Sequence, residues 1–243
     1  RNFWLEFDIR NHFKLGPVKY HNVVASIKGT KYPDEYVIIS GHLDSYDVAT
    51  GGIDCGTGIG PMMEAARMIA LSGAKPKRTI LFVAFAGEEF GLLGAKSYVK
   101  THAKELGKIA NLFNRDGGPT PPVGISVPQA MYDDFVEVCK PVKEIRADYP
   151  FEVKVAKPFK RPTQSGGTDA SVFAVEGGPT FGFNTQDIKG YNFSYGEIWH
   201  TERDLYTKNI PEYQEHAATV TAVVALGIAN LSKQLSREGM HKK

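Results

Sequence analysis

Short apolar runs alternate with segments of helical periodicity along most of the chain. The runs at residues 23–27, 36–40 and 79–87 predict strands, and the last two are continuous enough for strands covered on both faces. An earlier segment, residues 3–13, alternates apolar and polar side chains, which predicts a strand with one exposed face. Further strands are expected at 108–114, 123–127 and 179–183.

Apolar residues three and four positions apart predict helices between these strands. One opens at Pro61 and a second covers residues 92–106, while a third, over 132–140, should end before Pro141, which cannot donate a backbone hydrogen bond. The clearest helix is the last. Asn209 is expected to cap it, Glu212 follows at capping-box spacing, and an apolar stripe runs to Leu231.

Alternating strands and helices predict an α/β protein. We expect a three-layer α/β/α sandwich with a mixed, mostly parallel central sheet. The length suits one domain over residues 1–243, and no internal repeat or linker divides it. Because the chain starts at Arg1 rather than Met, we expect a processed product or a piece of a longer protein.

Charge and cysteine content exclude several classes of protein. Lys and Arg total 29 against 27 acidic residues, so nothing in the net charge of +2 favours nucleic acid or a membrane surface as a partner. No apolar run reaches the roughly 18 residues of a membrane span. Two cysteines, Cys55 and Cys139, exclude a disulfide scaffold and leave a single bridge undecided.

Carboxylates and imidazoles follow the predicted strands. Taken singly, each is more typical of a turn or a helix cap than of a site. The carboxyl ends of parallel strands, however, meet at one edge of a sheet, where ligands bind. The side chains expected there are His42 and Asp44, Asp54 in a glycine-rich loop, Glu88 and Glu89, Asp116, and the late pair His200 and Asp204.

Such a cluster needs cations. Burying unpaired carboxylates costs several kcal/mol each, and two divalent ions would offset most of that cost. Imidazole nitrogen and carboxylate oxygen without a thiolate cluster suit catalytic zinc, with cobalt or manganese as substitutes. Adjacent side chains at a strand end point in different directions. One of Glu88 and Glu89 can therefore bind metal while the other acts as a general base toward an activated water.

The same motifs resemble metallopeptidase family twenty-eight, the di-zinc exopeptidases. That family includes secreted aminopeptidases, the carboxypeptidase Q branch (plasma glutamate carboxypeptidase) and, more remotely, glutaminyl cyclases. The resemblance runs from about Asn22 to Leu231. It is carried by GHLDS (41–45), the glycine-rich loop around Asp54, AGEEFGLLGA (86–95), NRDGG (114–118), SGGTDASVF (165–173) and WHTERD (199–204).

The resemblance implies a role for each clustered residue. Glu88 would be the general base, and Asp44 the carboxylate that orients a metal-binding imidazole. The peptide bond after the bridging aspartate is often cis in this family, which places it before Cys55. The implied ligands of two zinc ions are His42 and Asp116 on one, Glu89 and His200 on the other, and Asp54 bridging both.

Several positions depart from the family pattern or stay open. Cys55 replaces a usual Asp or Asn, and would be either a thiol near the site or a small packed residue. Trp199 stands where relatives often have Tyr, which leaves Tyr195 as a candidate for the missing hydroxyl. Asp169 would cap the following helix or bind substrate, with the cap favoured, and Asp204 would steady His200 or its loop.

The implied activity is hydrolysis of a terminal peptide bond, with an aminopeptidase favoured. A carboxypeptidase or dipeptidase of the carboxypeptidase Q type is the alternative, and a glutaminyl cyclase or a non-catalytic binding module is less favoured. The expected partner is a peptide substrate, while monomer and homodimer both stay open. We also expect a secreted or periplasmic location and the loss of an upstream protease-associated domain, which many family members carry.

Overall fold

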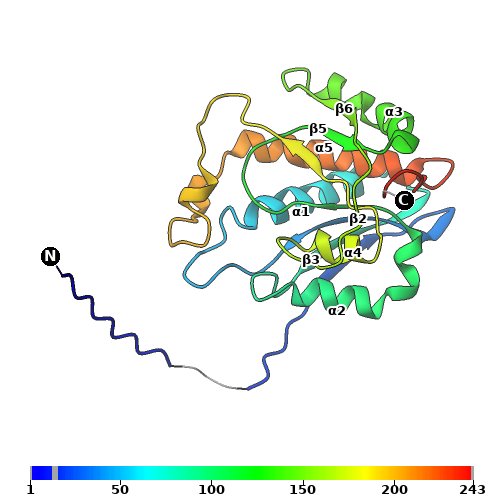
Figure 1. The fold of residues 1–243 in the computed structure, drawn as a ribbon. Helices are drawn as coiled ribbons and strands as arrows, with labels where there is room; N and C mark the ends of the chain where they lie inside the picture. Colours follow the sequence, from blue (N-terminus) through cyan, green and yellow to red (C-terminus); the bar gives the residue numbers. More distant parts are fainter. Residues whose placement is uncertain (1, 13–15, 242–243) are drawn as a thin grey trace.

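The computed structural model describes residues 2–12 and 16–241 (Figure 1). Its helices are α1 (Gly56–Leu71), α2 (Leu93–Thr101), α3 (Gln129–Ile145), α4 (Ala170–Val175) and α5 (Pro211–Asn230), with 3₁₀ turns at Ala103–Lys108, Tyr195–Glu197 and Tyr206–Lys208. Its strands are β1 (Val23–Ile27), β2 (Tyr32–His42), β3 (Arg78–Phe85), β4 (Ile109–Asn114), β5 (Pro122–Val127), β6 (Glu152–Val155) and β7 (Phe183–Thr185). No helix in the described ranges is long and apolar enough to cross a bilayer.

The strands form two mixed sheets. In the first, the order is β1-β3-β2-β4, with β2 parallel to both β3 and β4 and with β1 antiparallel at the edge. In the second, the order is β6-β5-β7. Residues 179–181 link the two, because Leu112 of β4 donates its N–H to the carbonyl of Pro179 (3.0 Å) and Asn111 exchanges two side-chain bonds with the backbone of Phe181.

Helices cover both faces of the first sheet, which confirms the three-layer prediction (Figure 1). Alternate residues of β2 show why: Val37 and Ile39 pack toward α1 and α5, whereas Ile38 packs toward α2 and α4. A strand whose side chains are buried on both faces must be largely apolar, as residues 37–39 of β2 and 80–85 of β3 are. The carboxyl ends of β2, β3 and β4 therefore emerge between two helical layers.

Element boundaries differ from the predictions where packing outweighs local signals. Helix α1 begins at Gly56, so Pro61 lies inside it, and α3 continues through Pro141 because Val142 beyond it is buried in the core. Ile210, not Asn209, is the N-cap of α5, and the side chain of Asn209 accepts a bond from the Ile210 N–H instead (2.9 Å). Helix α2 ends at Thr101, five residues before the predicted end at 106. The strand predicted at 179–183 is β7, which begins only at Phe183.

The strand predicted at residues 3–13 does not form over residues 3–12, and Phe13 lies outside the described residues. This segment extends away from the folded body, and its apolar side chains are exposed (Figure 1). The alternating pattern alone cannot form a strand without a neighbour to supply hydrogen bonds.

A buried histidine on α5 makes stability depend on pH. His216 is fully buried, its Nε2–H donates to the carbonyl of Pro122 (2.8 Å), and its ring stacks on Tyr149. Burial lowers the pKa of His216 to about 4, so the unfolded chain, with an ordinary histidine pKa near 6.5, binds the proton first. We therefore expect protonation of His216 in the unfolded chain to lower the free energy of unfolding by roughly 3 kcal/mol as the pH falls from 6.5 to 4.

Urea unfolding across that pH range tests this expectation. The variant His216→Gln keeps an N–H donor and cannot ionise, so its stability should vary less with pH than that of the wild type. Identical pH profiles for the two proteins would contradict the assignment.

Candidate metal centre

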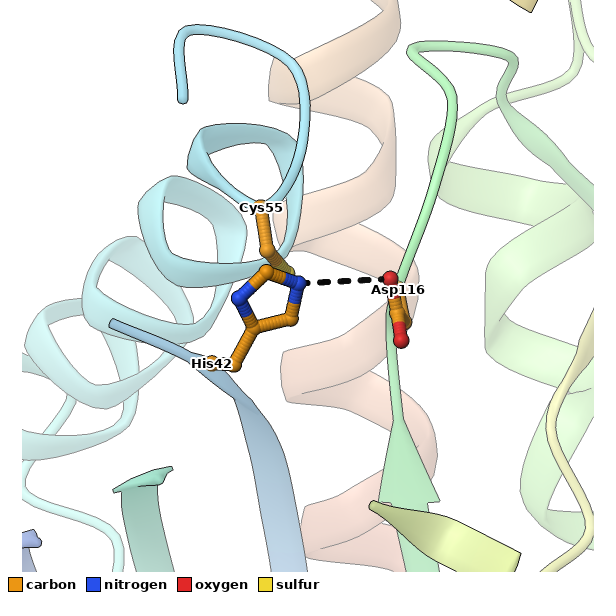
Figure 2. A group of neighbouring side chains, drawn as sticks. All are labelled: His42, Cys55 and Asp116. Carbon is orange, nitrogen blue, oxygen red and sulfur yellow. Dashed lines mark ion pairs between the residues drawn. The ribbon is translucent and has the colours of Figure 1, made fainter. Parts of the chain in front are cut away.

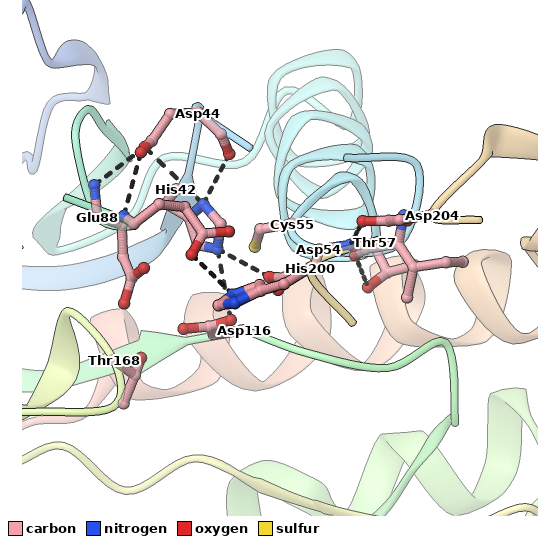
Figure 3. A network of polar contacts seen from close by, with 12 residues as sticks. His42, Asp44, Asp54, Cys55, Thr57, Glu88, Asp116, Thr168, His200 and Asp204 are labelled. Atoms are coloured by element: carbon pink, nitrogen blue, oxygen red, sulfur yellow. Dashed lines mark hydrogen bonds and ion pairs between the residues drawn. The ribbon is translucent and has the colours of Figure 1, made fainter. Parts of the chain in front are cut away.

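The seven predicted site residues come together at the carboxyl ends of β2, β3 and β4, and Figure 3 labels all of them except Glu89. His42 is the last residue of β2, Glu88 and Glu89 follow β3, and Asp116 follows β4. The remaining three come from connecting segments: Asp44 follows β2, Asp54 precedes α1, and His200 lies between β7 and α5.

His42 faces two carboxylates, of which Figure 2 shows that of Asp116. Its Nε2 lies 3.0 Å from Oδ1 of Asp54 and 3.5 Å from Oδ1 of Asp116. Its Nδ1 lies 2.9 Å from the backbone carbonyl of Asp44, which can only accept, so Nδ1 carries a hydrogen. Burial alone would lower the pKa of His42, but the bonds to Asp116 and Asp54 outweigh burial and raise it. A cation, whether proton or metal, belongs at Nε2.

His200 faces the other half of the cluster. Its Nε2 lies 2.9 Å from Oε2 of Glu89 and 3.8 Å from Oδ2 of Asp54, and its ring stacks on Tyr46. Asp54 thus presents one oxygen to each histidine. The second oxygen of Glu89 is buried and has no hydrogen-bond partner among the described residues.

The carboxylate of Asp44 hydrogen-bonds to the backbone of Glu88 and Glu89 and not to the ring of His42. Its two carboxylate oxygens accept the backbone N–H groups of Glu88 (3.0 Å) and Glu89 (3.1 Å). The nearer oxygen is 3.9 Å from Nδ1 of His42, beyond hydrogen-bond distance. The imidazole is therefore oriented by the main chain of Asp44, and the carboxylate aligns the two glutamates.

Asp204 supports the loop that carries Asp54. Its carboxylate accepts the N–H groups of Ile53 (2.6 Å) and Asp54 (3.1 Å), and its carbonyl accepts the hydroxyl of Thr50 (2.6 Å). The sequence led us to expect that Asp204 steadies His200 or its loop, and it gave no indication of the contact with Asp54. The two residues are 150 positions apart, and no local sequence signal joins them.

The structure shows whether Cys55 forms a disulfide and whether its thiol lies near the site. The Asp54–Cys55 peptide bond is cis, as the resemblance implies, and both cysteines are free. The thiol of Cys55 is buried and donates to the carbonyl of Arg115 (3.1 Å), and burial raises its pKa. Its sulfur also lies within the ligand-atom group of His42 and Asp116, so Cys55 is both packed and close to the site (Figure 2).

Asp169 occupies the N-cap position of α4, but its carboxylate makes no capping hydrogen bond. Both of its oxygens are buried without a partner among the described residues. Burial raises the pKa of Asp169 to about 7, and the charge of Asp116 also disfavours its ionisation. The expected capping role is thus wrong for the side chain.

A cavity of about 710 Å³ opens onto the cluster. Tyr195 and Trp199 line one part of it, and Tyr195 lies close to Asp54. Burial, together with the charge of Asp54, raises the pKa of Tyr195, so its hydroxyl stays protonated and available as a donor. Lys96 and the loop 165–168 line another part.

The residues present fit divalent metal. Within the described ranges, three groups of ligand atoms lie within 4.8 Å of one another: His42 with Cys55 and Asp116, His42 with Glu88 and Glu89, and Asp54 with Glu89 and His200. The orphaned oxygen of Glu89 and the paired approach of imidazoles to carboxylates leave places for cations. Nitrogen and oxygen donors of this kind suit zinc.

The family model for peptidase family M28 matches residues 22–224. The chain belongs to this family. Carboxypeptidase Q of Rattus norvegicus is 32% identical over 231 residues, which cover 93% of this chain and 46% of the relative. This M28 chain therefore spans about half the length of the curated relatives it matches.

Solved structures agree with that membership. A peptidase M28 precursor from Shewanella amazonensis SB2B has a TM-score of 0.74 and 33% identity, over 88% of this chain and 46% of its own. BSAP, a zinc aminopeptidase from Bacillus subtilis, has a TM-score of 0.65 and 21% identity, over 91% of this chain and 53% of its own. The second likeness supports the fold alone.

Proposed function

We propose that this M28 chain is a zinc-dependent exopeptidase. One observation carries the proposal: Asp54 lies between His42 and His200 and presents a different oxygen to each. A carboxylate in that position suits a bridge between two metal ions. The proposed ligands are His42 and Asp116 for one zinc and Glu89 and His200 for the other, with Asp54 shared and with cobalt or manganese as substitutes.

Bound zinc would supply a water of lowered pKa and a Lewis acid for the carbonyl of the substrate. Glu88 lines the cavity without being needed as a ligand, so we assign it the role of general base. It would take a proton from the attacking water and return one to the leaving amine. Tyr195 would donate its hydroxyl hydrogen to the oxygen on which negative charge develops. Asp44 holds the Glu88 backbone and thus sets the direction of that side chain.

The metal cluster alone does not fix which end of a peptide is cleaved. Aminopeptidase activity is the first proposal, and the bacterial zinc aminopeptidases share the fold. Carboxypeptidase or dipeptidase activity is the second, favoured by the carboxypeptidase Q relatives that match 93% of the chain. We also propose that the enzyme works outside the cytoplasm, as the family resemblance implies.

Peptides blocked at one end test the proposal. Zinc-loaded protein should hydrolyse a peptide with at least one free terminus and should leave a peptide blocked at both termini intact. Cleavage of the acetylated peptide indicates a carboxypeptidase, and cleavage of the amidated one an aminopeptidase. Internal cleavage of the doubly blocked peptide, or no cleavage of any peptide with zinc, cobalt or manganese, would contradict the proposed function.

A further inference from the structure

The catalytic cavity is lined by one permanently charged cation besides the imidazole of His200. Lys96 is the single Lys or Arg among the described residues that line the cavity, whereas Asp54, Glu88, Glu89 and Asp116 supply four carboxylates. The ammonium group of Lys96 forms no hydrogen bond or ion pair with any of them in the described parts of the chain.

The fold places Lys96 on the same wall as Glu88. Residues 88–92 leave β3 and lead into α2, and the N–H of Lys96 donates to the carbonyl of Leu92 (2.9 Å), one helical turn earlier. Gly91 and Leu92 line the cavity between them. The loop 165–168 also lines the cavity, and its Thr168 lies on the Glu88 side of the cluster, away from Asp204 (Figure 3).

The wall formed by Glu88 and Lys96 is where the leaving part of a substrate would lie. Glu88, as general base, would return its proton to the amine released by cleavage, so the residue bearing that amine must be next to Glu88. Tyr195 and Trp199 line the cavity alongside His200 and Asp54. The residue on the amine side of the cleaved bond is thus the one that approaches Lys96.

Charge indicates what Lys96 would bind there. The proposed pair of divalent ions carries four positive charges, which balance the four lining carboxylates. Lys96 then remains as an uncompensated positive charge on the leaving-group wall. A free amine would be repelled by it, whereas a carboxylate would be attracted.

We propose that Lys96 binds the free α-carboxylate of the residue released by cleavage, and so selects short peptides with an unblocked carboxyl end. The inference depends on the proposed exopeptidase function and deepens it toward the carboxypeptidase or dipeptidase alternative. Lys96 is a specificity-determining residue in this scheme and takes no part in proton transfer.

Two substrates that differ only at the carboxyl end test the proposal: alanyl-leucine and its amide, alanyl-leucinamide. The same bond is cleaved in both. We expect Lys96→Met to lower kcat/KM for the free acid about tenfold, mainly through KM, and to leave the amide unchanged. Lys96 is solvent-exposed, so screening keeps the effect near the lower end of the range for charged hydrogen bonds. Lys96→Arg should restore most of the preference.

Lys100 provides a matched control. It lies one turn farther along α2, on the wall of a neighbouring cavity of about 450 Å³ that Lys96 also lines, and it does not line the catalytic cavity. Lys100→Met removes the same charge and should leave both substrates unaffected. An equal loss from the two lysines, an equal loss on acid and amide with Lys96→Met, or no loss at all would each overturn the proposal.

A binding measurement separates this inference from the proposed function. Titration calorimetry of zinc-loaded Glu88→Gln protein with the two dipeptides needs no turnover. In that background, Lys96→Met should weaken binding of alanyl-leucine about tenfold and leave alanyl-leucinamide unchanged, and an unchanged affinity for the acid refutes the role of Lys96. Failure of the wild type to hydrolyse any peptide counts against the proposed function, while the calorimetry still decides on Lys96.

Discussion

Replacing Glu88 by glutamine is expected to lower kcat about 10³-fold while the zinc content stays unchanged. Glutamine has nearly the shape of glutamate but cannot accept and return a proton, and general acid–base catalysis by a positioned side chain contributes about 10² to 10⁴ in rate. The measurement is kcat for a peptide that the wild type hydrolyses, together with the metal content of the purified variant.

The surroundings of Glu88 explain the size of the expected loss. Burial raises the pKa of Glu88 to about 8, and the charge of Asp116 adds to the effect. In the zinc-loaded enzyme the positive charge of the metal would lower that pKa toward the working pH, where Glu88 can both take and release a proton. Its backbone is fixed by the bond to Asp44, so the carboxylate does not have to be ordered during the reaction.

Glu89→Gln is the matched control for this prediction. The two glutamates are adjacent, but only Glu89 pairs with His200, at 2.9 Å, and we propose it as a ligand. The control variant should lose activity and zinc together, whereas Glu88→Gln should lose activity alone. Substantial turnover by Glu88→Gln, or zinc loss equal to that of Glu89→Gln, would show that the two roles have been misassigned.

The strands that carry the site could be predicted because both their faces are buried. Residues 36–40 and 79–85 contain almost no polar side chain, and the first charged or imidazole groups after them are the site residues. Parallel pairing of β2 with β3 and β4 then brings His42, Glu88 and Asp116 to one edge. Here local pattern and global fold agree, and sequence reasoning succeeds.

Features that depend on distant contacts could not be predicted in this way. Asp204 supports Asp54 across 150 residues, and Asn111 links β4 to Phe181 across 70. The start of α1 depends on how the glycine-rich loop packs, not on the proline that usually marks a helix start. Lys96 has no motif of its own, and only the shape of the cavity separates it from an ordinary surface lysine.

Removing zinc is expected to abolish hydrolysis and to lower the unfolding temperature by about 10 °C. A ligand at about 1,000 times its Kd stabilises the folded state by about 4 kcal/mol, and 1 kcal/mol shifts the unfolding temperature of a chain of this size by about 2 to 4 °C. Differential scanning calorimetry of zinc-loaded and chelator-treated protein measures the difference, and added zinc should restore both properties.

Asp54→Asn shows whether that difference comes from the clustered acids. Asparagine keeps the shape of the side chain but is a weak metal ligand, so the variant should gain only about 2 °C from zinc. Asp133→Asn, an equivalent change at an exposed position on α3, should gain the full 10 °C. An unfolding temperature that chelation leaves unchanged in the wild type would mean that protons alone satisfy His42, Asp54 and Glu89. In that case the close approach of imidazoles to carboxylates would be a structural ion-pair network, and the proposed metal centre would have no support from stability.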